Sequence, residues 1–175
     1  MELFEAFAER HSYRGEFKNM PVPREDLAKI VEAGILAPSG CNAQTTSFAI
    51  VDDPLLLAEI RKLISMAAVQ TAPAMIAVIS QGQSTYRGMS FEVQDYAAAV
   101  ENMLLAISGL GYASVWLDGV LRTGGIAAKI ASLLNVPQGR NMAVTVILPV
   151  GVPGEKGRQN ERLPFEQRAW FNKKA

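Results

Sequence analysis

The segment from residue 91 to residue 110 constrains the fold of this chain more than any other. Its Ala, Leu and Met residues lie nearly all round a helical projection, so little of its surface suits water. A helix with this pattern is normally enclosed by other elements. We therefore expect the longest helix of the protein here, at the centre of the fold, with Gly109 and Gly111 ending it.

Shorter patterned segments lie on either side of this helix. Apolar spacing predicts further helices at residues 3–8, 23–37, 54–66 and 126–134. Apolar runs predict strands at residues 45–51, 74–80, 112–117 and 142–150. The 175 residues are enough for one domain with a hydrophobic core. Residues 153–175 carry few apolar side chains and form a tail.

Composition excludes several kinds of function. Lys plus Arg and Asp plus Glu both number 17, and this zero net charge argues against a nucleic-acid binder. One Cys and one His exclude an internal disulfide, most zinc sites and most His-based nucleophilic machinery. The first residues do not read as a signal peptide, and no apolar run is long enough for a bilayer. We expect a cytoplasmic protein that contacts no membrane and that would need a cofactor for any difficult chemistry.

A basic cluster follows the first predicted helix. In an extended segment, Arg10, Ser12 and Arg14 point the same way, and two guanidinium groups flanking a hydroxyl suit a phosphate. A solvated basic turn is the alternative interpretation of the same residues.

Three further polar segments are candidates for binding. The loop Ala-Pro-Ser-Gly-Cys-Asn-Ala-Gln at residues 37–44 offers donors and acceptors that suit the edge of a heterocycle, although these residues also favour ordinary turns. Gly119 follows the predicted strand that ends in Trp-Leu-Asp, and permits close approach of a ligand to the backbone. Arg162 lies in the tail, where a lone arginine is usually solvated.

In order and spacing, these segments together closely resemble the nitroreductase family of FMN-dependent oxidoreductases. The resemblance covers the chain from about Leu3 to Trp170. It implies an α+β fold with a central mixed or antiparallel sheet flanked by helices. It also implies one FMN-binding domain over residues 1–175, in a homodimer with two FMN sites at the subunit interface. Residues 153–175 would extend onto the partner subunit, although a tail that wraps its own subunit is the other possibility.

The resemblance also assigns roles to individual residues. Arg10 and Ser12 would hold the phosphate and ribityl chain, with His11 lining the site, and Arg14 would lie by the pyrimidine edge of the flavin and tune it. Arg162 matches a phosphate ligand in the tail. Pro38, Ser39, Asn42 and Gln44 match residues that face the ring from the other subunit. Asp118 and Gly119 match a pair at the end of a strand whose backbone lies by flavin N5.

Two positions depart from the family pattern. Asn160 stands where many relatives have a lysine, which shifts phosphate binding onto Arg10 and Arg162, with Arg158 as a candidate helper. A further polar flavin ligand is expected among residues 65–70 but is not assigned. No metal site is expected, and Cys41 is read as a small loop residue.

The function implied is electron transfer from NAD(P)H to a small acceptor such as a nitroaromatic or a quinone, by a ping-pong mechanism in which the flavin performs the hydride transfer. Residues 81–90 are a candidate lid, with Tyr86 placed to stack on an aromatic acceptor and Arg87 to meet the phosphate of NADPH. A same-fold reductive dehalogenase, an oxidative flavin enzyme and a flavin-storage module without turnover are the alternatives. The physiological acceptor and the choice between NADH and NADPH stay open.

Overall fold

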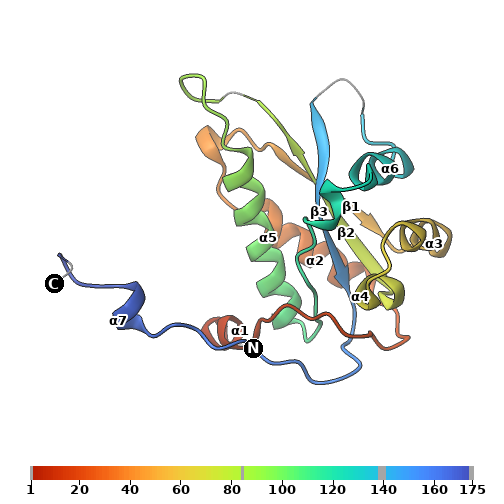
Figure 1. Cartoon of the computed structure of the whole chain (residues 1–175), viewed down its shortest axis with the longest axis horizontal. Helices are drawn as coiled ribbons and strands as arrows, with labels where there is room; N and C mark the ends of the chain where they lie inside the picture. The colour runs from red at the N-terminus through yellow and green to blue at the C-terminus, as the bar shows by residue number, and fades with distance from the viewer. Residues whose placement is uncertain (1, 84, 138–140, 174–175) are drawn as a thin grey trace.

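The computed structural model describes residues 2–83, 85–137 and 141–173. A three-stranded antiparallel sheet runs through its middle, in the order β1 (Thr46–Val51), β2 (Ala74–Gln81), β3 (Met142–Val150). Figure 1 shows this sheet with helices on both sides. The register between β2 and β3 shifts at Val78 and Ile79, which marks a bulge. These three strands and their order agree with the expected α+β class.

The central strand β2 is buried on both faces. Ala74, Ile76 and Val78 join one apolar cluster, and Met75, Ala77 and Ile79 join the other. Because successive side chains of a strand point to opposite faces, an unbroken apolar run here supplies two cores at once. The apolar run at residues 74–80 therefore contributes side chains to the cores on both faces of the sheet.

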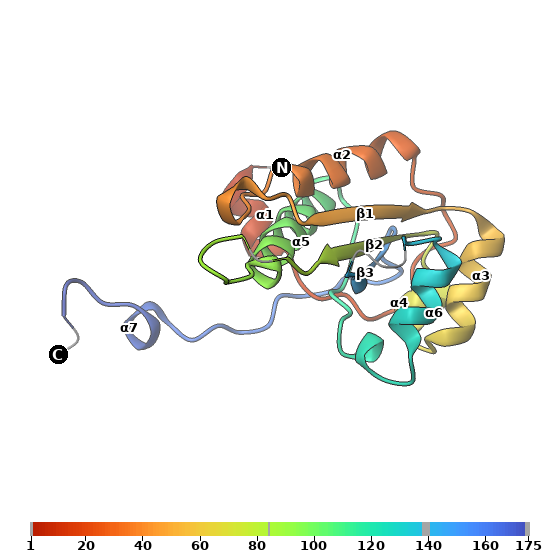
Figure 2. The same cartoon turned by 90° about the horizontal axis from the view of Figure 1, so that it is seen from above.

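Helices cover the two faces of the sheet separately. On one face α2 (Arg24–Ile35) packs against α5 (Glu92–Gly109), and α1 (Leu3–Glu9) packs beside α5. The other face carries α3 (Pro54–Leu63), α4 (Ala67–Thr71) and α6 (Ile126–Leu133). Two short 3-10 turns, η1 (Gly40–Asn42) and η2 (Val120–Arg122), and α7 (Phe165–Arg168) complete the described elements. Figure 2 shows the two helical layers from above.

Three sequence expectations need correction. Residues 112–117 form isolated bridges instead of a strand, because they pair with two different segments. Ala113 and Leu117 bridge Gly151 and Ile147, whereas Ser114 between them bridges Ser12. The helix expected over residues 54–66 ends at Leu63, where the Gln70 side chain donates to the carbonyls that the helix end exposes. The central helix α5 is buried along one side, whereas Val93 and Glu101 on it are exposed.

The first and last parts of the chain are joined at Tyr13. Its hydroxyl donates to the carbonyl of Glu16 and lies 3.0 Å from the N–H of Gly154, which donates to it. The ring itself is buried. Phe17 and Pro153 form an antiparallel bridge next to this point. The base of the tail therefore packs on its own subunit.

Beyond residue 159 the tail leaves the rest of the molecule. Both views place α7 away from the sheet and its helices (Figures 1 and 2). Its large apolar side chains are exposed, namely those of Leu163, Phe165, Trp170 and Phe171. Of the tail expected over residues 153–175, the base packs on its own subunit and residues 163–173 leave their apolar side chains exposed, so the place of these residues on a partner stays a prediction. Lys174 and Ala175 lie outside the described residues.

We predict that Tyr13→Phe lowers the free energy of unfolding by about 1 kcal/mol, because the carbonyl of Glu16 loses its hydroxyl donor while the ring remains. Urea denaturation followed by circular dichroism measures this difference. Tyr86→Phe is the matched control, since it removes the same hydroxyl from an exposed ring. Equal stabilities of the two variants would contradict this role of Tyr13.

Candidate functional site

The Arg10–Arg14 segment runs beside residues 113–117. Ser12 and Ser114 form a parallel bridge, and the N–H of Tyr13 donates to the carbonyl of Ser114 over 2.9 Å. Tyr13 is buried, whereas Ser12 and Arg14 on either side of it are exposed. The alternation expected of an extended segment is confirmed, and it leaves Ser12 and Arg14 on the side open to a ligand.

Arg10 is held in place from two directions. Its Nε lies 3.4 Å from a carboxylate oxygen of Glu101 on α5, and its side chain is 16% exposed. Its carbonyl accepts a hydrogen bond from the side-chain amide of Gln159 in the tail. The oxygen of that same amide accepts from Nη2 of Arg162 over 2.9 Å. Gln159 thus brings Arg10 and Arg162 close to each other, although it lies 149 positions from Arg10 and only three from Arg162.

Unsatisfied polar atoms lie beside Arg10. Nε2 of His11 and Oγ of Ser114 are buried with no hydrogen-bond partner among the described residues. Both residues line a small cavity with Arg10 at the end of α5. Buried polar atoms normally find partners, so each of these two has unused capacity to bind a polar group.

Tyr112 forms a fixed wall of the same cavity. Its hydroxyl donates to Oδ2 of Asp26 over 2.8 Å. Burial, and then this bond, raise the pKa of Tyr112 above its ordinary value. The pKa of Asp26 is lowered by its hydrogen bonds from Lys29 and Tyr112. The phenol therefore stays protonated at neutral pH and is a fixed donor to Asp26.

Asp118 and Gly119 follow residues 113–117 at the far end of this extended segment. The Asp118 carboxylate pairs with Arg122 at 2.8 Å, so its side chain is turned to η2. Gly119 is exposed, its N–H has no partner among the described residues, and a Cβ there would meet no atom within 4 Å. Three residues separate Ser114 from Asp118, so an extended chain places them about 13 Å apart. Because the Ser12–Ser114 bridge is parallel, Gly119 lies further along in the direction in which the chain runs from Ser12 to Arg14.

A second group of expected site residues surrounds η1. The N–H of Gly40 donates to Oδ1 of Asp95 over 2.7 Å, and Oγ1 of Thr45 donates to Oδ2 over the same distance. Oγ of Ser39 accepts from the N–H of Gln44. Cys41, Asn42 and Gln44 all have φ near +50°, a region that costs free energy for residues other than glycine. A buried carboxylate on α5 thus stabilises a strained loop.

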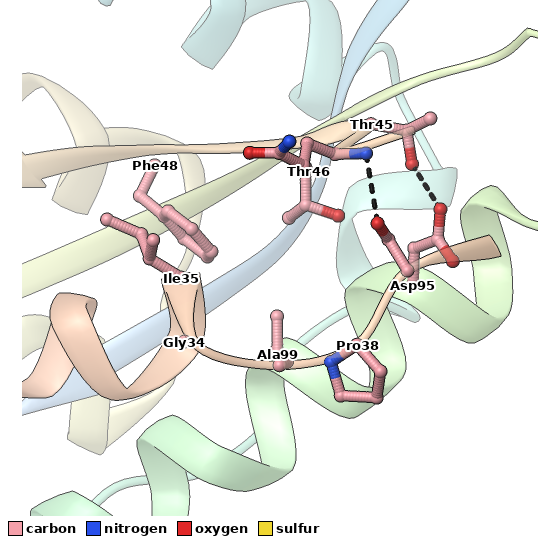
Figure 3. Close-up of a pocket in the computed structure, with 11 residues that line it drawn as sticks. Gly34, Ile35, Pro38, Thr45, Thr46, Phe48, Asp95 and Ala99 are labelled. Carbon is pink, nitrogen blue, oxygen red and sulfur yellow. Dashed lines mark hydrogen bonds between the residues drawn. The ribbon is translucent and has the colours of Figure 1, made fainter. Parts of the chain in front are cut away.

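This loop closes one side of the pocket in Figure 3. Pro38, Ser39 and Gln44 line it together with apolar side chains of α2, β1 and α5, including Ile35, Phe48 and Ala99. Oγ1 of Thr46 is buried there with no partner among the described residues. The exposed Asn42 is part of η1 itself.

One copy of the chain does not bring the two groups together. The η1 loop is bonded to Asp95 at the start of α5, whereas the Arg10–Arg14 segment passes Glu101 and the end of that helix (Figure 1). Residues 38–44 therefore lie apart from Arg10 and Arg162 within a single subunit.

The candidate lid is a narrow hairpin turn. Tyr86 and Met89 form a bridge, and Arg87 and Gly88 between them have positive φ. The Arg87 guanidinium lies 5.2 Å from the centre of the Tyr86 ring, within range of a cation–π contact. Both side chains are exposed, and their roles toward substrates stay predictions. Ser84 lies outside the described residues.

The described ranges hold no group of three His, Cys, Asp or Glu side chains suited to a metal ion. None of the helices there is long and apolar enough to cross a membrane. Cys41 is a free, exposed thiol in η1.

Sequence reasoning missed two residues that organise the site. Asp95 is 4% exposed, on a helix expected to be apolar nearly all round, and a carboxylate in such a place needs partners. That signal was present in the sequence. Gln159 gave no such signal, because its role depends on a contact between residues 149 positions apart.

We predict that Asp95→Ala lowers the free energy of unfolding by about 1–3 kcal/mol, because two buried donors lose their acceptor. It should also speed cleavage within residues 38–44 in limited proteolysis, which mass spectrometry locates. Gln94→Ala is the control, since it changes an exposed neighbour on the same turn of α5. Unchanged cleavage of this loop in Asp95→Ala would show that the carboxylate does not hold it.

Comparison with known proteins gives one consistent family. The model of the Nitroreductase family matches residues 7–68 and 55–152. A protein of Archaeoglobus fulgidus named for NADH dehydrogenase and NAD(P)H nitroreductase activity is 31% identical over 141 residues, which is 80% of this chain and 79% of that protein. An NADPH-dependent oxidoreductase of Staphylococcus epidermidis is 28% identical over 183 residues, covering 94% of this chain and 70% of its own.

Solved structures agree on the fold. The crystal structure of a BluB-like flavoprotein from Clostridium difficile superposes with a TM-score of 0.83 at 24% identity, over 99% of this chain and all of that one. The family match and the first relative cover most of this sequence. The chain therefore belongs to the nitroreductase family, and it is an NAD(P)H-dependent oxidoreductase.

Proposed function

We propose that the chain binds FMN and uses it to pass two electrons from NAD(P)H to a small acceptor, such as a nitroaromatic or a quinone. One observation carries this proposal. The Arg10–Arg14 segment, residues 113–119 and the base of the tail meet along one surface, with guanidinium groups at one end and an open backbone at the other.

The phosphate end fits the donors that are present. Arg10, Ser12 and Arg162 supply two cationic groups and a hydroxyl, which suit a phosphate dianion. The unpaired Oγ of Ser114 lies beside Arg10 and has capacity left for a polar ligand, whereas Nε2 of His11 is covered by Gly157 of the tail. Asn160 adds no charge, so Arg10 and Arg162 carry the phosphate, with Arg158 as the nearest further cation in the sequence.

The ring end fits a flavin for a different reason. Arg14 is exposed and lies on the same side of its segment as Ser12. Because the Ser12–Ser114 bridge is parallel, Arg14 is on the side of Ser12 that is nearer to Gly119. The free N–H of Gly119 suits an acceptor atom at the edge of a heterocycle, and the absence of a side chain lets the ring approach. Asp118 contributes backbone, because its carboxylate is paired with Arg122.

The other side of the ring comes from a second copy of the chain in this proposal. Residues 38–44, which include Pro38, Ser39, Asn42 and Gln44, share no hydrogen bond or ion pair with the Arg10–Arg14 segment among the described residues of their own subunit. An exposed apolar surface supports a dimer: Phe4 is 83% exposed and Leu36 82%, beside a groove lined by α1, α2 and α5. The exposed apolar side chains of residues 163–173 fit a tail that lies on the partner subunit.

Bound FMN supplies a ring that accepts a hydride from NAD(P)H and returns two electrons to the acceptor. The chain's own residues bind and orient it: Arg10 and Arg162 hold the phosphate, and the Gly119 N–H holds one edge of the ring. The positive charge of Arg14 stabilises the negative charge that the ring gains on reduction. Both substrates use the same open face, so their binding alternates and ping-pong kinetics follow.

We predict that Arg10→Ala and Arg162→Ala each weaken FMN binding to the apoprotein by at least about tenfold, because each removes a charged donor to phosphate. Riboflavin, which has no phosphate, should bind both variants as it binds the wild type. Quenching of flavin fluorescence measures all of these affinities. Arg24→Ala is the control, since Arg24 at the start of α2 pairs with Asp52, which follows β1. Unchanged FMN affinity in both site variants would contradict the proposed phosphate site.

We predict that Arg14→Ala shifts the midpoint potential of the bound flavin to more negative values, on the order of 30 mV for a two-electron couple. Loss of a positive charge disfavours the reduced ring. Arg14→Lys keeps the charge and should keep most of the potential. Spectroelectrochemical titration distinguishes the variants, and equal potentials in all three proteins would remove Arg14 from the tuning role.

A flavin-storage module is separated from a reductase by anaerobic mixing. We expect NADH or NADPH to bleach the flavin absorbance of the purified yellow protein within seconds, and a nitroaromatic or quinone then to restore it. A yellow protein that neither nucleotide bleaches would overturn the reductase proposal and favour storage.

A further inference from the structure

We propose that Gln159 is a positioning residue for the cofactor phosphate, because its one side-chain amide links the two arginines expected to hold it. Nε2 of Gln159 donates to the carbonyl of Arg10, and Oε1 accepts from Nη2 of Arg162. Both polar atoms of the amide are therefore used, each toward a different arginine. This inference rests on the proposed binding of FMN.

The two bonds limit how far Arg162 can lie from Arg10. An amide places its oxygen and nitrogen on one carbon, so Nη2 of Arg162 lies within roughly 8 Å of the Arg10 carbonyl. A long, exposed arginine in a tail otherwise samples many rotamers, and ordering it costs free energy when a ligand binds. Gln159 orders the Arg162 side chain before a ligand binds, and the remaining N–H groups of the guanidinium stay available to an anion.

The backbone of the tail brings Gln159 to this place. Gly157 passes over His11 so closely that a Cβ there would lie 1.8 Å from Nε2 of the imidazole. Two residues later, Gln159 reaches the Arg10 carbonyl. A side chain at position 157 would lift the tail off His11 and separate the amide from Arg10.

Gln159 is not needed to fasten the tail itself. Tyr13 and Glu16 already bond Gly154, and Phe17 bridges Pro153. The hydrogen bonds of Gln159 come after these along the chain and before α7. Their effect therefore falls on Arg162, three residues further on.

The test is the affinity of the apoprotein for FMN and for riboflavin, measured by fluorescence quenching, in the full-length chain. Gln159→Met keeps the length and shape of the side chain and removes both hydrogen bonds. We expect it to bind FMN about tenfold more weakly, the equivalent of one hydrogen bond to a charged group, and riboflavin unchanged. Gln94→Leu, an exposed glutamine on α5, is the matched control and should change neither affinity.

A double-mutant cycle gives the second readout. If Gln159 acts through Arg162, Gln159→Met should have no further effect on FMN binding in the Arg162→Ala background. Additive losses, equal losses for FMN and riboflavin, or an unchanged FMN affinity would each overturn the inference. Failure of the proposed function looks different: there, Arg162→Ala and Arg10→Ala would themselves leave FMN affinity unchanged.

Discussion

The buried Tyr13 hydroxyl is the interaction on which the arrangement of the site depends. It bonds Glu16 beside the basic segment and Gly154 at the base of the tail, so it joins parts of the chain 141 residues apart. Ser12 and Ser114 align the same segment with the strand-like residues 113–117. Through these contacts three distant pieces of sequence present their polar groups along one surface. They bring the base of the tail to the basic segment, and Gln159 then links Arg10 to Arg162.

A buried carboxylate performs the equivalent task at the other end of α5. Asp95 satisfies Gly40 and Thr45, and it thereby holds a loop in which three residues other than glycine have positive φ. Strain of this kind persists only where the surroundings fix the backbone. The loop is bonded to Asp95 near the start of α5, and Arg10 of the basic segment pairs with Glu101 further along that helix, so the two groups of polar residues are held separately within one chain. In the dimer proposed above, the loop of one copy would face the basic segment of the other.

Local patterns in the sequence predicted much of this. The apolar run at residues 74–80 indicates a buried strand, and the alternation of Arg10, Ser12 and Arg14 indicates an extended segment with its polar side chains on one side. Predictions failed where the outcome depends on a distant partner. Residues 112–117 have the composition of a strand but change neighbours every few residues, and the helix expected over residues 54–66 ends early because Gln70 bonds Arg61 and Ile64.

The most direct measurement of the central claim is a crystal structure of the chain grown with FMN. We expect the phosphate against Arg10, Ser12 and Arg162 of one subunit, with the Gly119 N–H at an edge of the ring and residues 38–44 of a second subunit facing the ring. A flavin bound wholly within one subunit, or a phosphate placed away from both arginines, would contradict it.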